Sequence, residues 1–448
     1  MDTLIELSRA KNSKNSFLHI LLTSAILSLL GLFLIDAPVS QSSLATAASS
    51  FSSSFSSSAS ISAVTATTLL GISNSNNKNN EKNVVDDQAS AVMSQVKDAV
   101  ISHVGNRSNT ASIVVGLITP NGTQVVGYRN ISKANSTTVN GNTIFDIASV
   151  TKTFTTLLLA DMVKRGLVNL DDPAQKYLPT ANVKVPSYNG TIGREVGGGL
   201  AHNNNTNSKP VIITLEDLAT HTSGLPDFPP GFVRNQSYTT QQIYNAISNT
   251  KLQSEPGTRV NYSDIGMALL GHVLSLRSAV PYEQLVKNKI SDVLGMDSTG
   301  ISLTSAEKSI LAKGHIDGKE VNLEFLPELV QPAGALHSTA NDLLKYLSAT
   351  MGLIQTKLND IMQETQLIRH AFPAPLDTKF YIGLGWIIYT NFAREVIFHN
   401  GTIYGYESFV GFNPSSKIGL VILCSCDEKN VPPQTFINIG DAYLLNHS

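Results

Sequence analysis

The chain of 448 residues has little cysteine and no excess of charge of either sign. Its two cysteines, Cys424 and Cys426, stand one residue apart in an apolar run, so they predict neither a disulfide framework nor a cysteine-based zinc site. Lys and Arg number 32 against 34 Asp and Glu, which gives a formal net charge of -2. Because there is no basic excess, nucleic acid is not an expected partner.

Signatures of several common enzyme classes are also missing. Gly-x-Ser-x-Gly, the nucleophile turn of α/β-hydrolases, does not occur, and neither does His-Glu-x-x-His of metalloproteases. The phosphate-binding Gly-x-x-x-x-Gly-Lys-Ser/Thr is absent, which argues against a nucleotide hydrolase. The ten histidines are scattered along the chain, so the sequence predicts no metal site and no cofactor.

One long apolar run is present, at residues 17–35, and it carries no formal charge. At 1.5 Å per residue its length nearly spans a bilayer core of roughly 30 Å. Basic residues precede the run and an acidic residue follows it: Arg9, Lys11, Lys14 and Asp36. This charge order predicts a single-pass signal anchor in the cell membrane, with the rest of the chain outside. A cleaved signal peptide, with a cleavage site at 45–47, and a buried core helix are the alternatives.

The chain divides into three predicted parts: residues 1–36 with the apolar run, a flexible linker at 37–87, and a globular domain at 88–448. Residues 40–62 hold 13 Ser among 23 positions and have no apolar face, which is typical of a spacer. Ten Asn-x-Ser/Thr sequons would suit an exported glycoprotein, although a chain rich in Asn and Ser produces several by chance.

Strand-like patterns gather at the two ends of the globular part, around a middle with helical patterning. They cover residues 111–118, 123–128, 381–389, 395–399, 408–412 and 418–424, and a closing helix is predicted at 435–445. This order predicts an α+β fold in which an antiparallel sheet flanked by helices carries an inserted all-α subdomain. Residues 187–210 are predicted as a loop insertion. Their glycines follow Arg194-Glu195-Val196, which is not predicted as a strand, so a phosphate cradle is not expected there.

A candidate nucleophile is Ser149, in Ser149-Val150-Thr151-Lys152. Residues three apart share one face of a helix, so this spacing places an amine beside a hydroxyl. Ser-x-x-Lys occurs six times in the chain, about as often as chance allows. Ser149 alone stands at an apolar strand-to-helix junction, between a strand-like run at 143–148 and a helix that runs to about Arg165. There the helix N-terminus would assist the nucleophile.

A second candidate is Tyr262, in a turn at 256–264 that leads into an apolar helix at 265–276. A phenol near a lysine shifts towards phenolate and is then able to accept the nucleophile's proton and deliver it to a leaving group. Taken alone, a tyrosine in a loop is usually structural, so this role depends on the other candidates.

The third element is His399-Asn400-Gly401-Thr402, predicted at the end of a late strand. The glycine would allow a substrate to lie against the backbone there. The Thr402 N–H would complete an oxyanion hole with the Ser149 N–H. Taken alone, a histidine at a strand end is more often a satisfied polar residue than a catalytic one.

Together these elements resemble the penicillin-recognising serine hydrolases of the class C β-lactamase, D-alanyl-D-alanine carboxypeptidase and esterase group. Ser149, Tyr262 and His399 follow the family order of Ser-x-x-Lys, Tyr-x-Asn and Lys-Thr-Gly or His-x-Gly. Residues 213–226 are similar to the family's His-Thr-Ser-Gly-Leu-Pro signature, and residues 332–343 resemble its later Gly-Ser-Thr segment. The similarity covers about residues 90–448.

The resemblance implies a β-lactamase/transpeptidase-like sandwich with the site between sheet and helices, and an acyl-enzyme mechanism. Ser149 would be the nucleophile, activated by Lys152, and Tyr262 would relay the proton to the leaving group. The backbone N–H groups of Ser149 and Thr402 would hold the oxyanion. Whether Lys152 or Tyr262 is the base stays open. His221 of the His-Thr-Ser-Gly-Leu-Pro stretch is interpreted as shaping the site, not reacting.

Two substrate-facing positions depart from the β-lactamase pattern. Asp264 replaces an amide donor with a carboxylate that accepts only, and its charge would favour the ammonium form of Lys152. His399 stands where β-lactamases keep Lys, so a fixed charge for a substrate carboxylate is lost. With Asn400 and Gly401 as further substrate-binding residues, we expect a small-molecule or peptide substrate cleaved at an ester or amide bond. The alternatives are a non-catalytic exported binding protein, a true class C-like β-lactamase, and acyl transfer to an amine.

Overall fold

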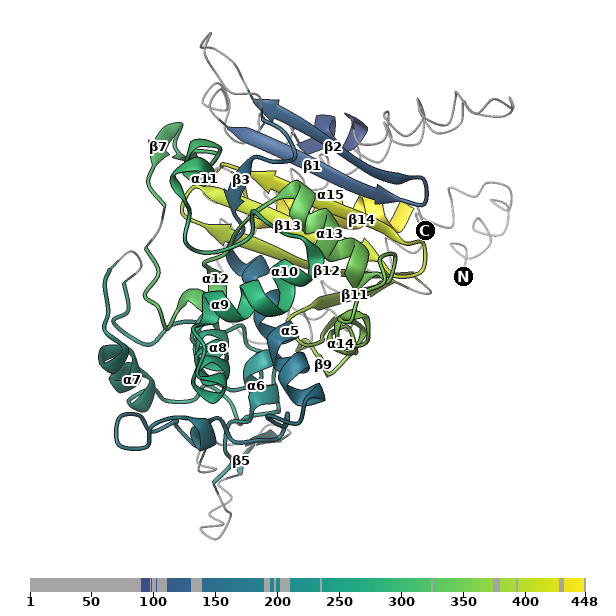
Figure 1. Cartoon of the computed structure of the whole chain (residues 1–448). Coiled ribbons are helices and arrows are strands. Elements are labelled where there is room, and N and C mark those ends of the chain that lie inside the picture. Colours follow the sequence, from purple (N-terminus) through teal and green to yellow (C-terminus); the bar gives the residue numbers. More distant parts are fainter. Residues whose placement is uncertain are drawn as a thin grey trace, which may run out of the picture. The chain divides into compact units, whose positions relative to one another are not determined.

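Alternating apolar residues at the two ends of the described chain pair into one eight-stranded antiparallel sheet, in the order β2-β1-β14-β13-β12-β11-β10-β9. Its strands are β1 (Ser112–Thr119), β2 (Gly122–Arg129), β9 (His370–Ala371), β10 (Phe380–Ile382), β11 (Ile387–Asn391), β12 (Arg394–Ile403), β13 (Tyr406–Asn413) and β14 (Ile418–Cys424). Figure 1 shows the early strands β1 and β2 beside the late strand β14. The predicted antiparallel sheet is therefore present, and it joins segments 300 residues apart in sequence.

This computed structural model describes residues 90–446 except 97, 99–101, 103–110, 130–138, 189–193, 197–198, 202–209, 234–235, 324, 374–378, 392–393 and 427–430. The described residues belong to one of two units into which the chain divides, residues 78–448. The predicted membrane segment at 17–35 and the whole predicted linker at 37–87 lie outside the described residues. Among the residues that are described, no helix combines the length and the apolar character needed to cross a bilayer.

Both faces of the central strands are buried. Every residue of β1 is buried, with Val114 and Ile118 on one face and Ile113, Val115 and Leu117 on the other. Helix α15 (Pro433–Asn446) covers the second face, and α13 (Ala340–Thr350) covers the first. Strands covered on both faces carry near-continuous apolar runs, which is why β14 was predictable from its sequence.

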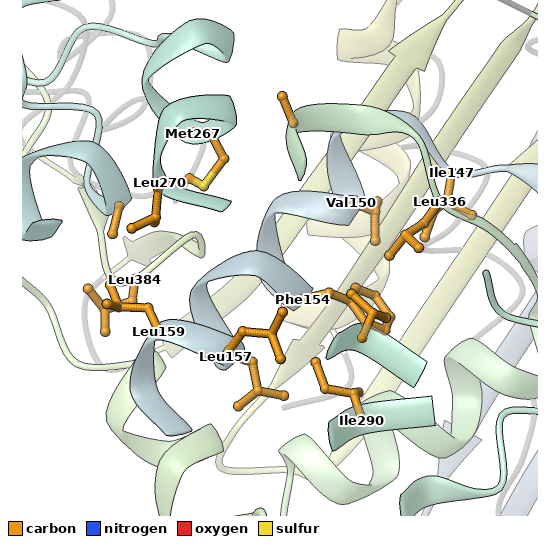
Figure 2. Packing of buried hydrophobic residues seen from close by; sticks show 14 of the residues in the cluster. Ile147, Val150, Phe154, Leu157, Leu159, Met267, Leu270, Ile290, Leu336 and Leu384 are labelled. Carbon is orange, nitrogen blue, oxygen red and sulfur yellow. The ribbon is translucent and has the colours of Figure 1, made fainter. Parts of the chain in front are cut away.

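The part of the chain between β3 (Ile144–Asp146) and β9 is mainly helical. Besides α13, its helices are α5 (Thr151–Lys164), α6 (Leu215–Ala219), α7 (Thr240–Ser248), α8 (Asp264–Ser278), α9 (Tyr282–Val286), α10 (Asp292–Leu294), α11 (Ser305–Ser309), α12 (Gln331–Gly334) and α14 (Asn359–Thr365). Eleven of the 14 residues of α5 are buried, so it has neighbours on nearly every side. Figure 2 shows Phe154 and Leu157 of α5 within the same apolar cluster as Met267 and Leu270 of α8.

Buried threonines anchor α5 to the segments around it. The Thr155 hydroxyl donates to the Pro332 carbonyl at 2.7 Å, and the Thr156 hydroxyl donates to the Leu384 carbonyl at 2.9 Å. The Thr151 hydroxyl accepts from the Leu336 N–H at 3.1 Å. Because these buried groups are paired, burial of a polar helix face costs little, and the first turn of α5 is fixed in position.

The structure corrects four local predictions. The predicted strand at 381–389 is two strands, β10 and β11, because Gly385 turns the chain with a φ of +72°. The predicted loop at 187–210 contains the hairpin β4 (Arg194–Val196) and β5 (Gly199–Ala201), so the glycines do follow a strand. The insertion is not purely helical, because β6 (Gly314–Ile316) pairs with β7 (Lys319–Val321). His399 lies inside β12, not at a strand end.

Cys424 and Cys426 are joined by a disulfide. Residues two apart in extended chain point to the same side, and the two Cα atoms lie 5.4 Å apart, which is within the reach of a disulfide. The bond links neighbouring positions at the end of β14, so it ties no separate elements together and does not amount to a disulfide framework.

Candidate active site

Ser149 is presented by a sharp turn between a short strand and α5. Strand β3 (Ile144–Asp146) pairs with β8 (His337–Thr339), and a 3-10 turn, η2 (Ala148–Val150), follows it. Ala148 adopts a φ of +46°, a conformation that L-residues rarely take, and its N–H donates to Asp146 Oδ1 at 2.9 Å. This strained turn places Ser149, which is half-buried, directly before the N-terminus of α5.

Lys152 is fully buried one turn further along α5, and its Nζ lies among several polar groups. It donates to Ser149 Oγ at 2.9 Å and to the Ala333 carbonyl at 2.6 Å, and it lies 2.7 Å from Asp264 Oδ1. The Tyr262 side chain is a further hydrogen-bond partner of Lys152. The arrangement is that of a protonated lysine held between the candidate nucleophile and a carboxylate.

The charge state of Lys152 follows from opposing influences. Burial favours a lower pKa for Lys152, but the Asp264 carboxylate and the Tyr262 hydroxyl outweigh it and raise that pKa above its ordinary value. The Lys152 Nζ lies 4.9 Å from the centre of the Tyr262 ring. Burial raises the pKa of Tyr262, although Lys152 acts in the opposite direction. Both groups therefore hold their protons at neutral pH.

His221 contacts Tyr262 and both of its neighbours in the chain. Its carbonyl accepts from the Asn261 N–H at 2.7 Å, and its Nδ1 accepts from the Ser263 N–H at 3.2 Å. Its ring lies against the Tyr262 ring, with centroids 4.5 Å apart. Since Nδ1 accepts, and since burial and nearby Lys152 lower the His221 pKa well below its ordinary value, the imidazole is neutral. These contacts would allow His221 to shape the site by positioning Tyr262, as the sequence predicts.

The third predicted element, residues 399–402, belongs to β12 and lies beside the Ser149 turn. His399 is buried, and burial together with Lys152 lowers its pKa to about 3, so it carries no charge at neutral pH. Its Nδ1 lies 2.6 Å from the Asn400 carbonyl, which only accepts, so Nδ1 bears the ring proton. A Cβ on Gly401 would lie 2.4 Å from the Ile147 carbonyl oxygen and 2.9 Å from the Ser149 nitrogen. Glycine is what allows β12 to approach the Ser149 turn this closely.

A pocket opens beside Ser149. Its lining consists of Ala148, Ser149, Phe228, Phe232, Gln236, Asp264, Phe325, Leu326, Pro327, Val330, Ala333, Gly334, Thr402 and Ile403. Among the predicted site residues, Ser149, Asp264 and Thr402 line it. The aromatic residues were not predicted, and the signal for them was the phenylalanine-rich stretch that follows residues 213–226. Within the described part of the chain, no cluster of three or more His, Cys, Asp or Glu could hold a metal ion.

Known proteins resemble this chain over most of its length. A family model described as beta-lactamase matches residues 98–440. The D-alanyl-D-alanine-carboxypeptidase/endopeptidase AmpH of Escherichia coli strain K12 is 25% identical over 365 residues, which cover 78% of this chain and 87% of that protein. A beta-lactamase of Pseudomonas fluorescens is 26% identical over 384 residues, covering 78% and 97% of the two chains. The solved D-alanine carboxypeptidase AmpC of Burkholderia cenocepacia has a TM-score of 0.62 at 23% identity, covering 80% of this chain and 99% of that one.

An antiparallel sheet packed against helices, with Ser-x-x-Lys at the strand-to-helix junction, defines a serine hydrolase. The chain belongs to the beta-lactamase family. Its relatives carry the names of β-lactamases and of D-alanyl-D-alanine carboxypeptidases, and the fold of the solved structures matches the predicted sandwich.

Proposed function

We propose that this enzyme cleaves ester or amide bonds in substrates that lack a carboxylate near the scissile bond, through an acyl-enzyme on Ser149. The observation that carries the proposal is the contact of Ser149 Oγ with the Lys152 ammonium, 2.9 Å away, inside a cluster with Asp264 and Tyr262. An activated nucleophile needs a neighbouring proton-transfer group held by a third residue, and this cluster supplies both.

The proposed reaction runs in two balanced halves, and it starts from the form in which the Lys152–Tyr262 pair has released one proton to solvent. Ser149 Oγ bonds to the substrate carbonyl carbon and gives its proton to the vacant site of that pair, while the N–H groups of Ser149 and Thr402 stabilise the oxyanion. The bond to the leaving group then breaks, and the leaving group takes that proton. Water attacks the acyl-enzyme by the same route in reverse, which releases the acid and restores Ser149.

Electrostatics supports substrates without a carboxylate. Neutral, buried His399 offers no fixed positive charge, and the Lys152 charge is compensated by Asp264. A substrate carboxylate would have no cationic partner at these positions and would meet the Asp264 carboxylate instead. For this reason we propose esters and uncharged amides over β-lactams, even though relatives are named for β-lactam and D-alanyl-D-alanine cleavage.

The test is mass spectrometry of the intact full-length protein after exposure to a fluorophosphonate and, separately, to a penicillin. Ser149→Ala is the control. We expect a fluorophosphonate adduct that depends on Ser149 and no rapid turnover of penicillin. If neither reagent labels Ser149, the non-catalytic binding protein is the better account. Rapid penicillin turnover would contradict the substrate preference and would favour a true class C-like β-lactamase.

We also propose, from the apolar run at 17–35 alone, that the chain is anchored in the cell membrane with the hydrolase domain outside. Alkaline carbonate extraction of membranes, combined with protease protection, tests this placement. Release of the intact domain into the medium would support the cleaved-signal alternative instead.

A further inference from the structure

The pocket beside Ser149 has walls of apolar side chains. The loop before α7 contributes Phe228 and Phe232, and the segment before α12 contributes Leu326 and Val330. Ile403 at the end of β12 also lines the pocket. Ser149 and Thr402 are part of the same lining, so a substrate whose carbonyl reaches Ser149 places an adjoining group against these apolar walls.

The aromatic wall is preformed. The rings of Phe228 and Phe232 are stacked with centroids 4.7 Å apart, and the rings of Phe232 and Tyr238 are stacked at the same distance. The Tyr238 hydroxyl accepts from the Val233 N–H at 2.9 Å, which ties the stack to the backbone of its own loop. Phe228, Phe232 and Tyr238 also pack against the main apolar cluster. A wall that is ordered before binding costs little entropy when a ligand docks.

The pocket offers no partner for a charged ligand group. Of the described residues in its lining, Asp264 alone is ionisable, and its charge is paired with Lys152. A carboxylate or ammonium that entered between these walls would lose its water without gaining a counter-ion. An uncharged apolar group would instead gain roughly 25 cal/mol for each Å² that it removes from water.

We infer that this pocket sets the specificity of the enzyme: it selects neutral esters or amides that carry an uncharged alkyl or aryl group next to the scissile bond. The inference rests on the proposed function and deepens it, because it names the substrate class of the same site. The alkyl or aryl group that occupies the pocket belongs either to the acyl portion of the substrate or to its alcohol portion. Two pairs of substrates distinguish these cases.

The experiment uses the full chain and two matched pairs of esters. The first pair, 4-nitrophenyl butyrate and 4-nitrophenyl hemisuccinate, differs only by a methyl group or a carboxylate at the end of the acyl chain. The second pair, 4-methylphenyl acetate and 4-carboxyphenyl acetate, places the same change on the alcohol side. Each kcat/KM is divided by the rate of hydroxide-catalysed hydrolysis to remove differences in reactivity. We expect the neutral member to be favoured roughly 100-fold in at least one pair.

A charge-introducing variant locates the effect. Phe232→Lys places a cation in the aromatic wall and is expected to reduce the preference for the neutral ester roughly tenfold or more. Leu367→Lys is the matched control, because Leu367 is 53% exposed and lies outside the pocket lining. The control should retain the wild-type preference.

The outcomes separate this inference from the proposed function. Ser149-dependent turnover with equal kcat/KM for both members of both pairs overturns the inference and leaves the proposed function standing. A preference that Phe232→Lys and Leu367→Lys change to the same extent also overturns it. If no ester is hydrolysed and the fluorophosphonate does not label Ser149, the proposed function fails first.

Discussion

Asp264 Oδ1 lies 2.7 Å from Lys152 Nζ, and the lysine side chain is fully buried while the aspartate side chain is 15% exposed. Asp264 is the first residue of α8, where the positive end of the helix dipole favours a carboxylate. Its N–H donates to Asp227 Oδ1 at 3.0 Å. The ion pair therefore compensates a buried charge beside Ser149, and we expect it to influence which group accepts the Ser149 proton in the proposed reaction.

Asp264→Asn should move the pH dependence of acylation downward. In the wild-type enzyme the pKa values of Lys152 and Tyr262 are both raised, so acylation should increase on the alkaline side of neutrality. Without the carboxylate, burial dominates and the Lys152 pKa falls, so a neutral amine exists at lower pH. We expect the alkaline rise to shift down by about one pH unit or more. The rate of fluorophosphonate labelling at Ser149 against pH measures it.

The control for this variant is Asp227→Asn, which removes a nearby carboxylate but keeps an oxygen for the Asp264 N–H. It should leave the profile close to that of the wild-type enzyme. If Asp264→Asn also leaves the profile unchanged, the ion pair does not determine the base.

Gly401→Ala should sharply reduce activity, because the new Cβ would lie 2.4 Å from the Ile147 carbonyl oxygen and 2.9 Å from the Ser149 nitrogen. Both are backbone atoms, so the Ser149 turn or β12 has to move, and the oxyanion hole is disturbed. Loss of one oxyanion donor costs roughly 100-fold or more in kcat. Gly300→Ala is the matched control, since Gly300 lies outside the pocket lining and a Cβ there meets its nearest atom, Glu283 Oε1, at 3.4 Å. Steady-state kinetics with circular dichroism distinguishes lost catalysis from lost folding.

His221→Phe should lower kcat more than it raises KM. The phenyl ring retains the stack against Tyr262, but the Ser263 N–H loses its acceptor, and that buried group costs about 1–3 kcal/mol when unpaired. We expect kcat to fall roughly tenfold, because Tyr262 is no longer held in line with Lys152. His272→Phe removes a comparable hydrogen bond, to Tyr244, on α8. It should lower stability without a selective loss of kcat; equal effects on kcat would contradict the positioning role.

The sequence predicts elements whose pattern is local, and it misses those decided by distant contacts. Strand β14 has the predicted bounds, and α5 begins beside Ser149 as its apolar run indicates. The break between β10 and β11 depends on Gly385, where a Cβ would lie 2.5 Å from the Thr156 hydroxyl of α5. No local pattern contains that contact, because the two residues are far apart in sequence.

The same distinction holds for the site. The order of Ser149, Tyr262 and His399 was visible in the motifs, and the structure brings all three around Lys152. The aromatic wall was not visible, because Phe228 and Phe232 line the pocket together with Leu326 and Val330, which are about 100 residues away in sequence. The burial of His399 likewise follows from its position inside a central strand, whereas the motif alone placed it at a strand end.

Asp441 on α15 should make the protein less stable as pH rises from about 4 to 7. Burial raises its pKa to about 7, and its Oδ1 has no hydrogen-bond partner. Within this range the folded state retains a proton that the unfolded chain has released, so the free energy of unfolding falls by at most about 1.4 kcal/mol per pH unit. Asp441→Asn should therefore raise the melting temperature at pH 8 and flatten its dependence between pH 5 and 8. Asp360→Asn, at an exposed position, should leave that dependence unchanged. If the two variants show the same slope as the wild-type protein, the Asp441 carboxylate is not titrating in the fold.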